Sequence, residues 1–395
     1  MENKIIDLIK SKSISLHAKV INYRRHIHQF PELSYHEDKT MLFVAEQLTK
    51  IGIKPKINVG GTGVTALILG HKHKPNQNCV ALRADLDALP IQEENEVDYK
   101  SEVNGVMHAC GHDVHTSILL GVSEILFELK DHLPQPVKLI FQPGEEKNPG
   151  GATLMIKDGV LKKPKVDQIF GLHVFPDLEV GKVGFREGVY MASCDEIYIT
   201  FEGNGGHGAM PQKAIDTILM GSQFVTSIQH LVSRLTDPIL PIVLSFGHFE
   251  AIGATNVIPK KAILKGTLRT FDEKWRKEAE DIIKKHAIAI SEQYGGKVEV
   301  VFDKGYPFLN NNPAITKELK EKAIQVLGID KVVELPLRMT SEDFAFYSQE
   351  VPATFFRLGV RNEAKGIVHG VHTPLFDIDE DALVVGMQIM ASSVF

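Results

Sequence analysis

The stretch His108-Ala-Cys-Gly-His-Asp113 runs directly into an apolar helical pattern and places four side chains that bind metal ions within six residues. Cysteine thiolate and neutral imidazole are the ligands that hold zinc and its borderline-soft neighbours. The short spacing lets one tight loop present Cys110 and His112 to a single ion or to a pair of ions. The sequence therefore predicts a metal site at a junction between a strand and a helix.

Three further stretches place ligand side chains after apolar segments. They are Phe141-Gln-Pro-Gly-Glu-Glu146, Gly171-Leu-His-Val174 and Gly370-Val-His-Thr-Pro374. In α/β proteins the carboxyl ends of strands are where sites are assembled, so these loops can converge although they span most of the chain. The sequence predicts a composite, metal-dependent active site.

Composition sets limits on fold and partners. The chain has 395 residues, of which 43% are hydrophobic and 24% charged, enough for a full core and two domains. A net charge of −6 without long basic runs argues against a nucleic-acid partner. We expect no signal peptide, and the longest apolar runs fall short of the ~20 residues that cross a membrane. Three cysteines do not form a disulfide framework, which favours a cytoplasmic location.

Residues 1–187 alternate between helical and strand patterns. Helices are predicted at 2–25, 40–51 and 116–129, and buried strands at 64–69, 79–83, 137–141 and 168–172. This order predicts an α/β catalytic domain with a mainly parallel sheet. Residues 305–395 return to the same domain, with a helix at 315–327 and strand-like pieces that carry 340–343 and 355–358.

The intervening residues 188–304 have a different pattern. Strands are predicted at 194–201, 242–246, 262–270 and 297–302, and helices at 214–232 and 273–292. The resulting order, β-α-β-β-α-β, is the split βαβ or ferredoxin-like arrangement. We therefore expect a self-contained domain inserted into the catalytic domain.

These motifs, together with Arg24-Arg-His-Ile-His-Gln-Phe-Pro-Glu32 and Gly205-Gly-His-Gly-Ala-Met-Pro-Gln212, resemble a known family. It is the metal-dependent amidohydrolase and carboxypeptidase family (metallopeptidase family M-twenty), which includes N-acyl-amino-acid amidohydrolases, hippurate hydrolases and auxin-conjugate hydrolases. The resemblance spans nearly the whole chain. It implies a di-metal, exopeptidase-like catalytic domain and an inserted lid domain that also mediates dimerisation.

The resemblance also implies roles for particular residues. The implied metal ligands are Cys110, His112, Glu146, His173 and His372. Glu145 is the implied general base, and the chemistry supports this division, because a carboxylate bound to metal cannot also shuttle a proton efficiently. Water held between two divalent cations has its pKa lowered toward about 7, within reach of such a base. Zn, Mn, Co and Ni all suit this ligand set, and Cys110 is expected between the two ions because a thiolate is negatively charged.

One turn departs from the wider superfamily. In distant members of the superfamily, the turn after the strand that corresponds to 79–83 resembles a His-x-Asp hairpin whose histidine binds metal. This chain has Ala84-Asp85-Leu-Asp87 at that turn. Asp85 is a candidate oxygen ligand. Since Cys110 and His112 already fill the ligand count, we interpret Asp85 and Asp87 as groups that orient the ligands.

Other polar residues near the motifs have structural interpretations. Asp113 and His115 are expected to support ligands rather than to bind metal. Glu342 and Asp343 either support the site or cap the helix that follows them. Cys79 lies in an apolar strand pattern and is expected to be a buried core thiol.

The inserted domain supplies three candidates of its own. His207 lies in a glycine-rich loop, and the resemblance implies that it reaches the site of a partner subunit and polarises the scissile carbonyl. Without the resemblance, a surface histidine in a turn is the simpler interpretation. Asn256 and Arg269 are candidate contacts to a substrate carboxylate; a capping asparagine and an ordinary surface arginine explain them nearly as well.

Three function classes follow from these observations. The first is hydrolysis of the amide bond of N-acyl-amino acids, with water activated by Glu145. The second is a carboxypeptidase or dipeptidase that acts on short peptides with the same machinery. The third is a non-catalytic, metal-dependent binding protein, which the presence of both Glu145 and Glu146 argues against. We expect a homodimer or a higher homo-oligomer, with no membrane or nucleic-acid partner.

Overall fold

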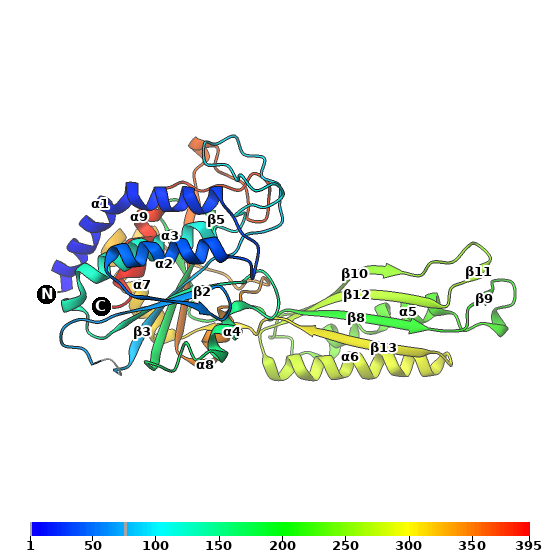
Figure 1. The fold of residues 1–395 in the computed structure, drawn as a ribbon. Coiled ribbons are helices and arrows are strands. Elements are labelled where there is room, and N and C mark those ends of the chain that lie inside the picture. The colour runs from blue at the N-terminus through cyan, green and yellow to red at the C-terminus, as the bar shows by residue number, and fades with distance from the viewer. Residues whose placement is uncertain (1, 75–76) are drawn as a thin grey trace. The chain divides into compact units, whose positions relative to one another are not determined.

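The protein divides into two compact units. The computed structural model describes residues 2–74 and 77–395 (Figure 1). The first unit comprises the chain up to Tyr190 together with Asn310–Pro336 and Asp343–Phe395, and the second comprises Met191–Leu309 and Leu337–Glu342. No helix in the described part of the chain is long and apolar enough to cross a membrane.

The first unit is built on an eight-stranded sheet in the order β1-β2-β4-β3-β5-β16-β6-β15. These strands are β1 Pro55–Val59, β2 Gly63–Ile68, β3 Cys79–Asp85, β4 Val137–Gln142, β5 Val166–Glu179, β6 Val183–Phe185, β15 Val332–Glu334 and β16 Ala353–Arg361. The central strands β4, β3, β5 and β16 are parallel to their neighbours within that group. The predicted α/β class with a mainly parallel sheet is confirmed. The sequences of the central strands are largely apolar because both faces of the sheet are covered.

Helices cover this sheet (Figure 1). They are α1 Glu2–Gln29, α2 Asp38–Ile51, α3 His112–Glu128, α4 Gly151–Lys157, α7 Pro313–Leu327, α8 Ala345–Glu350 and α9 Ala382–Ser392. Nearly all of α3 is buried, because it packs against α1, α9 and the sheet. A Cβ atom at Gly121 would lie 2.5 Å from the sulfur of Met387 in α9 and 2.8 Å from a methyl carbon of Val20 in α1, so a glycine here favours the close packing of α3 against both helices.

The second unit has its own sheet and core. Its main elements are β8 Asp195–Glu202, α5 Thr217–Ser227, β10 Ile242–Glu250, β12 Lys261–Thr270, α6 Glu273–Gln293 and β13 Lys297–Lys304. The order β-α-β-β-α-β is the predicted one, and the strands pair antiparallel in the order β10-β12-β8-β13. Alternate residues of β8, including Ile197 and Phe201, are buried against Phe224 of α5 and Ile283 of α6. This alternation is what a sheet with one face covered by helices requires.

Short elements complete the chain. They are the strands β7 Gly188–Met191, β9 Gly206–His207, β11 Val257–Ile258 and β14 Leu309–Asn311, the 3-10 turns Lys130–His132, Pro211–Lys213, Ile329–Lys331 and Glu363–Lys365, and the π-helical turn Leu231–Leu235. The predicted helix at 214–232 is therefore shorter than expected. It begins at Thr217, after the turn Pro211–Lys213, and ends at Ser227, before a separate π-helical turn.

Two other sequence-based boundaries are wrong. The segment 340–343 is not in a strand, because its polar side chains have no alternating pattern and Asp343 lies in the turn before α8. The predicted strand at 168–172 continues to Glu179, because β16 pairs with β5 along this length. His173 therefore lies inside a strand rather than after one, opposite Arg357 of β16.

Candidate metal centre

Cys110 and His112 sit at the start of α3. Helix α3 begins at His112, and Gly111 before it has a left-handed backbone with φ of 86°. A Cβ atom at Gly111 would lie 2.5 Å from a methyl carbon of Val174 on β5. Both the conformation and the contact require glycine, so the Cys-Gly-His sequence is what lets this turn lie against the sheet.

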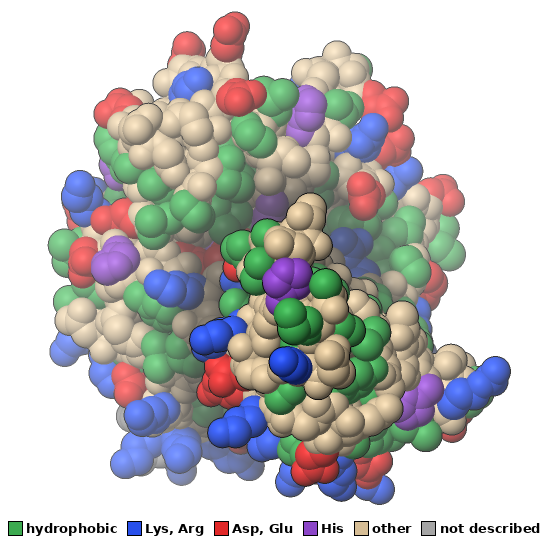
Figure 2. Space-filling view, turned by 90° about the vertical axis from the view of Figure 1, so that its right-hand side faces the viewer, with side chains coloured by type: hydrophobic (Ala, Val, Ile, Leu, Met, Phe, Trp, Pro, Cys, Tyr) green, Lys and Arg blue, Asp and Glu red, His purple; other side chains and the backbone are tan. Residues whose placement is uncertain are grey.

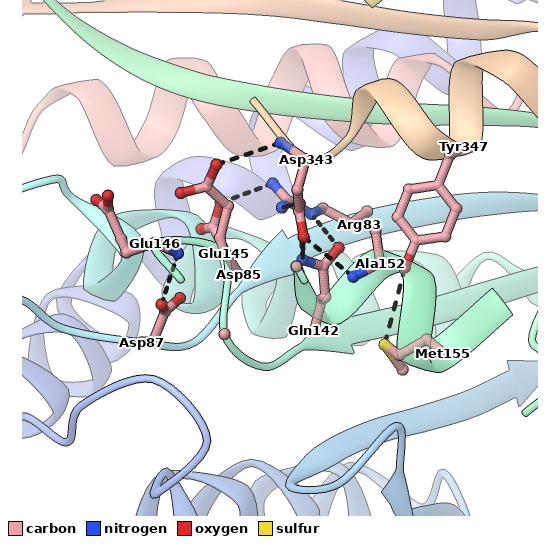
Figure 3. A network of polar contacts seen from close by, with 12 residues as sticks. Arg83, Asp85, Asp87, Gln142, Glu145, Glu146, Ala152, Met155, Asp343 and Tyr347 are labelled. Carbon is pink, nitrogen blue, oxygen red and sulfur yellow. Dashed lines mark hydrogen bonds and ion pairs between the residues drawn. The ribbon is translucent and has the colours of Figure 1, made fainter. Parts of the chain in front are cut away.

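Glu145 and Glu146 lie in a closed loop between β4 and α4. The N–H of Gly151 donates to the carbonyl of Gly144 at 2.9 Å, and a Cβ at Gly151 would lie only 1.6 Å from the carbonyl oxygen of Pro143. The N–H of Glu146 donates to Oδ2 of Asp87 at 2.9 Å (Figure 3). The loop is therefore held at both ends, which fixes where the two carboxylates point.

Cys110 is the centre of the cluster. Its Sγ lies 3.3 Å from Nε2 of His173 on β5 and 3.3 Å from Nε2 of His372 in the loop before α9. The same Nε2 of His372 lies 3.1 Å from Oε1 of Glu146. His372 has a positive φ of 61°, and its N–H donates to the carbonyl of Ala109 at 2.7 Å. A non-glycine residue held in this conformation is typical of functional sites.

The structure brings all five predicted ligands together. Their ligand atoms form overlapping sets, each within 4.8 Å: Cys110, His112 and His173; Cys110, Glu146 and His372; and His112, Glu145 and Glu146. The sets share members, so the arrangement is one extended cluster rather than separate triads. An extended cluster of this kind suits a pair of ions better than one.

The imidazoles fit metal binding. Nδ1 of His112 lies 3.2 Å from Oδ1 of Asp87, and Nδ1 of His173 lies 2.7 Å from the carbonyl of Val174. Hydrogen bonds through Nδ1 leave Nε2 as the ligand atom, which is how metal-binding histidines are usually oriented. Nε2 of His112 is buried and has no hydrogen-bond partner within the part of the chain that the structure describes. A bound cation would satisfy this atom.

The charge of the cluster also fits cations. Burial disfavours a charged imidazole, yet Asp85 and Asp87 raise the pKa of His112 to about 10. Burial raises the pKa of the Cys110 thiol well above its ordinary value, and Glu146 and Glu145 raise it further. The carboxylates around the cluster thus give it an excess of negative charge. Without a bound cation, protons on His112 and Cys110 would have to neutralise that charge. Divalent ions provide the same compensation and let Cys110 be a thiolate.

Asp87 contacts the predicted ligands His112 and Glu146, whereas Asp85 contacts His115 and Arg83. Oδ1 of Asp85 lies 2.6 Å from Nδ1 of His115, and its Oδ2 accepts from Arg83 at 2.6 Å. Asp87 accepts from His112, from the N–H of Glu146 and from the hydroxyl of Ser34. Both carboxylates are engaged by donors, as orienting groups would be, while Asp85 also lies within 4.8 Å of ligand atoms of His112 and His115 and remains the alternative ligand.

Asp113 and His115 likewise make hydrogen bonds to groups outside the set of predicted ligands. Oδ2 of Asp113 accepts from Nε of the buried Arg24 at 2.8 Å and lies 2.9 Å from Nδ1 of His28. Nε2 of His115 accepts from the N–H of Val174 at 2.9 Å. These contacts join α1, α3 and β5 beneath the cluster, so both residues support the site from behind.

Glu145 is placed differently from Glu146. It is 6% exposed, and its Oε2 lies 4.0 Å from Nε2 of His112. Its Oε1 accepts a hydrogen bond from the backbone N–H of Asp343 at 3.3 Å (Figure 3). The carboxylate therefore stands beside the ligand atoms with one oxygen held by the backbone.

The three other predicted site residues belong to the second unit. His207 on β9 pairs with Val257 on β11, and the carbonyl of Asn256 accepts from the N–H of Gly208 at 2.7 Å, so this pairing brings His207 and Asn256 together. Arg269 lies apart from them on β12, where its Nη1 donates to the carbonyl of Met339 at 3.0 Å.

Sequence reasoning missed Arg83 and Gln142, and it left open whether Asp343 supports the site or caps a helix. The helix-cap interpretation of Asp343 is wrong, because the N-cap position of α8 is Phe344 and no side chain caps it. The Asp343 carboxylate instead accepts from Arg83 and Gln142, which are both buried. A signal was present in β3, since an arginine inside a strand buried at every position must find buried acceptors.

Comparison with known proteins identifies the family. The model of peptidase family M20/M25/M40 matches residues 81–395. This chain belongs to that peptidase family. The matched region contains every predicted ligand, Glu145 and the whole second unit.

Two relatives and one solved structure are similar to this chain over most of its length. The chain is 39% identical to thermostable carboxypeptidase 1 of Saccharolobus solfataricus over 97% of this chain and 96% of that one. It is 44% identical to N-acyl-L-amino acid amidohydrolase of Geobacillus stearothermophilus over 74% of this chain and 78% of that one. The structure of Bacillus subtilis YXEP protein, a dinuclear metal binding peptidase from the M20 family, is 33% identical, with a TM-score of 0.82, covering 96% of this chain and 98% of that one.

Proposed function

We propose that this protein hydrolyses the amide bond of N-acyl-amino acids, using two divalent metal ions and Glu145 as the general base. The observation that carries the proposal is the position of Cys110, whose sulfur lies 3.3 Å from Nε2 of both His173 and His372. With His112 and Glu146 beside it, this cluster offers thiolate, imidazole and carboxylate ligands. That donor set suits zinc and is also compatible with manganese, cobalt and nickel.

The residues divide the chemistry between them. Divalent ions held by the five ligands supply Lewis acidity, which activates water and polarises an amide carbonyl. Glu145 takes a proton from the attacking water at Oε2, since Oε1 is occupied by the N–H of Asp343. It then delivers the proton to the leaving amine as the carbon–nitrogen bond breaks. One carboxylate thus serves as base and acid in turn.

Similarity supports the acyl-amino-acid substrate class. The relative with 44% identity is named N-acyl-L-amino acid amidohydrolase. The test is release of free amino acid from N-acetyl and N-benzoyl amino acids, measured before and after metal removal by a chelator. Turnover that survives full removal of metal would contradict the proposal.

A carboxypeptidase or dipeptidase activity is the second candidate. The relative named thermostable carboxypeptidase 1 is similar over nearly the full length of both chains, and it supports this alternative. The same ligands and base would serve both reactions, which differ in what the substrate pocket accepts. Dipeptides and N-blocked peptides in the same assay separate the two activities by their kcat/KM values.

We also propose that the second unit mediates dimerisation and that His207 acts in the site of the partner subunit. Exposed hydrophobic side chains support a contact surface there: Met210, Ile218, Leu219, Ile252 and Val257 are each at least 44% exposed. Figure 2, which faces the end of the second unit that carries β9 and β11, shows hydrophobic side chains beside a surface histidine. An exposed apolar surface of this kind favours a protein partner. Asn256, close to His207, and Arg269 remain candidate contacts to a substrate carboxylate.

The three cysteines support a reducing location such as the cytoplasm. Cys79, Cys110 and Cys194 are all free thiols. A free, metal-binding cysteine is compatible with a compartment that keeps thiols reduced.

A further inference from the structure

Arg83 is a buried arginine in β3 that joins two carboxylates. Its Nη1 donates to Oδ2 of Asp85 at 2.6 Å, and its Nη2 donates to Oδ1 of Asp343 at 2.8 Å. Its Nε donates to Oε1 of Gln142 at 3.0 Å. All four side chains are essentially inaccessible to solvent. The planar, forked guanidinium can make these contacts at once, which a lysine cannot.

The carboxylate of Asp343 is surrounded by donors. Besides Arg83, Nε2 of Gln142 donates to Oδ1 at 2.8 Å and to Oδ2 at 2.7 Å, and the N–H of Ala152 donates to Oδ2 at 3.0 Å (Figure 3). These donors come from β3, β4 and the first turn of α4. A residue held from three elements has a fixed backbone as well as a fixed side chain.

The fixed backbone of Asp343 reaches the proposed base. Its N–H donates to Oε1 of Glu145 at 3.3 Å, while Oε2 of Glu145 lies on the side of His112. The last torsion of a glutamate side chain is broad, and this hydrogen bond restrains it by holding Oε1 of Glu145. The hydrogen bond therefore selects which oxygen faces the ligand cluster.

Arg83 extends the same restraint to the ligands. Asp85, at its other end, is hydrogen-bonded to His115 and has Oδ2 at 3.7 Å from Nε2 of His112. The Arg83 guanidinium thus sets the distance between Asp343, which holds Glu145, and Asp85, which lies beside the ligand His112. Small changes in such distances cost activity steeply, since a misplacement of about 1 Å can lower a rate ~100-fold.

We infer that Asp343 is the positioning residue of the general base, and that Arg83 couples it to the metal-ligand side of the site through Asp85. This inference rests on the proposed function, because it assigns Asp343 a role through Glu145. Because it acts through Glu145, Asp343 is a positioning residue rather than a catalytic one. The competing interpretation is that Arg83 and Asp343 only stabilise the fold, as a buried ion pair between distant segments can.

The test compares Asp343→Asn with two further variants. An amide at position 343 keeps the shape but turns an N–H group toward the donors that surround the carboxylate, so the residue must shift. Gln142→Met leaves every charged group in place but removes the Nε2 group, which makes two hydrogen bonds to the Asp343 carboxylate, and the Oε1 acceptor of Arg83 Nε. Asp195→Asn is the matched control, because Asp195 is also fully buried and accepts from Nε of Arg276 at 2.7 Å, but lies in the second unit.

Each metal-loaded protein is studied by three experiments: steady-state kinetics on an N-acetyl amino acid, which give kcat and KM; elemental analysis of metal content; and a crystal structure that shows the Glu145 side chain. We expect Asp343→Asn to lower kcat about 10- to 100-fold with KM and metal content within about twofold of wild type. Gln142→Met should lower kcat less, and Asp195→Asn should leave kcat per folded molecule unchanged. Glu145 should occupy more than one conformation in the Asp343→Asn crystal.

Several results would overturn the inference. They are an unchanged kcat in both Asp343→Asn and Gln142→Met, a loss of metal in proportion to activity, or a Glu145 side chain that keeps its position. If Asp343→Asn fails to fold, Gln142→Met decides the question by the same measurements. Wild-type protein that hydrolyses no amide would contradict the proposed function instead, and the crystal structures would still decide whether Asp343 positions Glu145.

Discussion

Sγ of Cys110 lies 3.3 Å from Nε2 of His372, although 262 residues separate them in the chain. The contact depends on the loop of His372, whose N–H is bonded to the carbonyl of Ala109, one residue before the cysteine. The two ligand loops are thus joined by their backbones, and the ligand atoms converge as a consequence.

The adjacent glutamates should respond differently to the same substitution. Glu145→Gln removes the base but no ligand, so we expect metal content near wild type and turnover lowered at least ~100-fold. Glu146→Gln removes a ligand oxygen and should lower metal occupancy. Elemental analysis and steady-state kinetics on both variants check this. Equal loss of metal in the two proteins, or an active Glu145→Gln, would show that the roles are wrongly assigned.

Metal removal should expose the reactivity of Cys110. A metal-bound thiolate is shielded from alkylating reagents, so Cys110 should be labelled slowly in the metal-loaded protein and faster after chelation. Cys79, which is fully buried, serves as the internal control and should change little. Mass spectrometry of the alkylated peptides gives both rates. Identical labelling of Cys110 in the two states would remove it from the ligand set.

His207 should act across subunits. Mixed dimers of His207→Ala and Glu145→Gln contain one site with both groups intact, so mixing the two inactive proteins under conditions of subunit exchange should restore part of the activity. Each variant alone, taken through the same exchange, is the control. A mixture that stays inactive after native mass spectrometry has verified exchange would place His207 within its own chain or outside catalysis.

The loop that carries Glu145 and Glu146 should not tolerate a side chain at Gly151. Because a Cβ there would lie 1.6 Å from the carbonyl oxygen of Pro143, Gly151→Ala must displace the loop, and we expect lower metal occupancy and a lower Tm. Gly247→Ala is a matched control, since no atom lies within 4 Å of the Cβ added there. Wild-type metal content in Gly151→Ala would mean that the loop can adapt without disturbing the ligands.

His28 should make stability depend on pH. Burial lowers its pKa, as does Arg24, but Asp113 and Glu93 outweigh both, so its pKa lies above the ordinary value of 6.5. A raised pKa in the folded state stabilises the protein below the unfolded pKa, and this contribution is lost as the pH rises through the folded pKa. Urea midpoints should therefore fall more between about pH 6 and pH 8 for wild type than for His28→Gln. Parallel profiles would contradict this account of His28.

The sequence was sufficient for the features that depend on local pattern. The period of apolar residues predicted the main helices and strands, and the β-α-β-β-α-β order of the second unit was readable for the same reason. The ligand stretches were recognisable because cysteine, histidine and paired glutamates stood after apolar segments. Their convergence on Cys110 was expected from the parallel sheet, although no local pattern fixes a distance.

What the sequence did not reveal depends on long-range contacts. Arg83 and Asp343 are 260 residues apart, and neither shows by itself that it will pair with the other. The length of β5 also escaped prediction, because its second half is a strand only through pairing with β16. Such features are set by tertiary packing, which single-segment patterns do not report.

The position of β16 also bears on how the protein is synthesised. In the finished sheet, β16 lies between β5 and β6, yet the ribosome completes the entire second unit before Ala353 emerges. Domains generally fold as units during translation, so the second unit can fold while the first still lacks a central strand. Until then the apolar edge of β5 has no partner on that side, and an unpaired edge of this kind invites aggregation. The nascent chain is therefore expected to depend most on chaperones while residues 191–352 are being made.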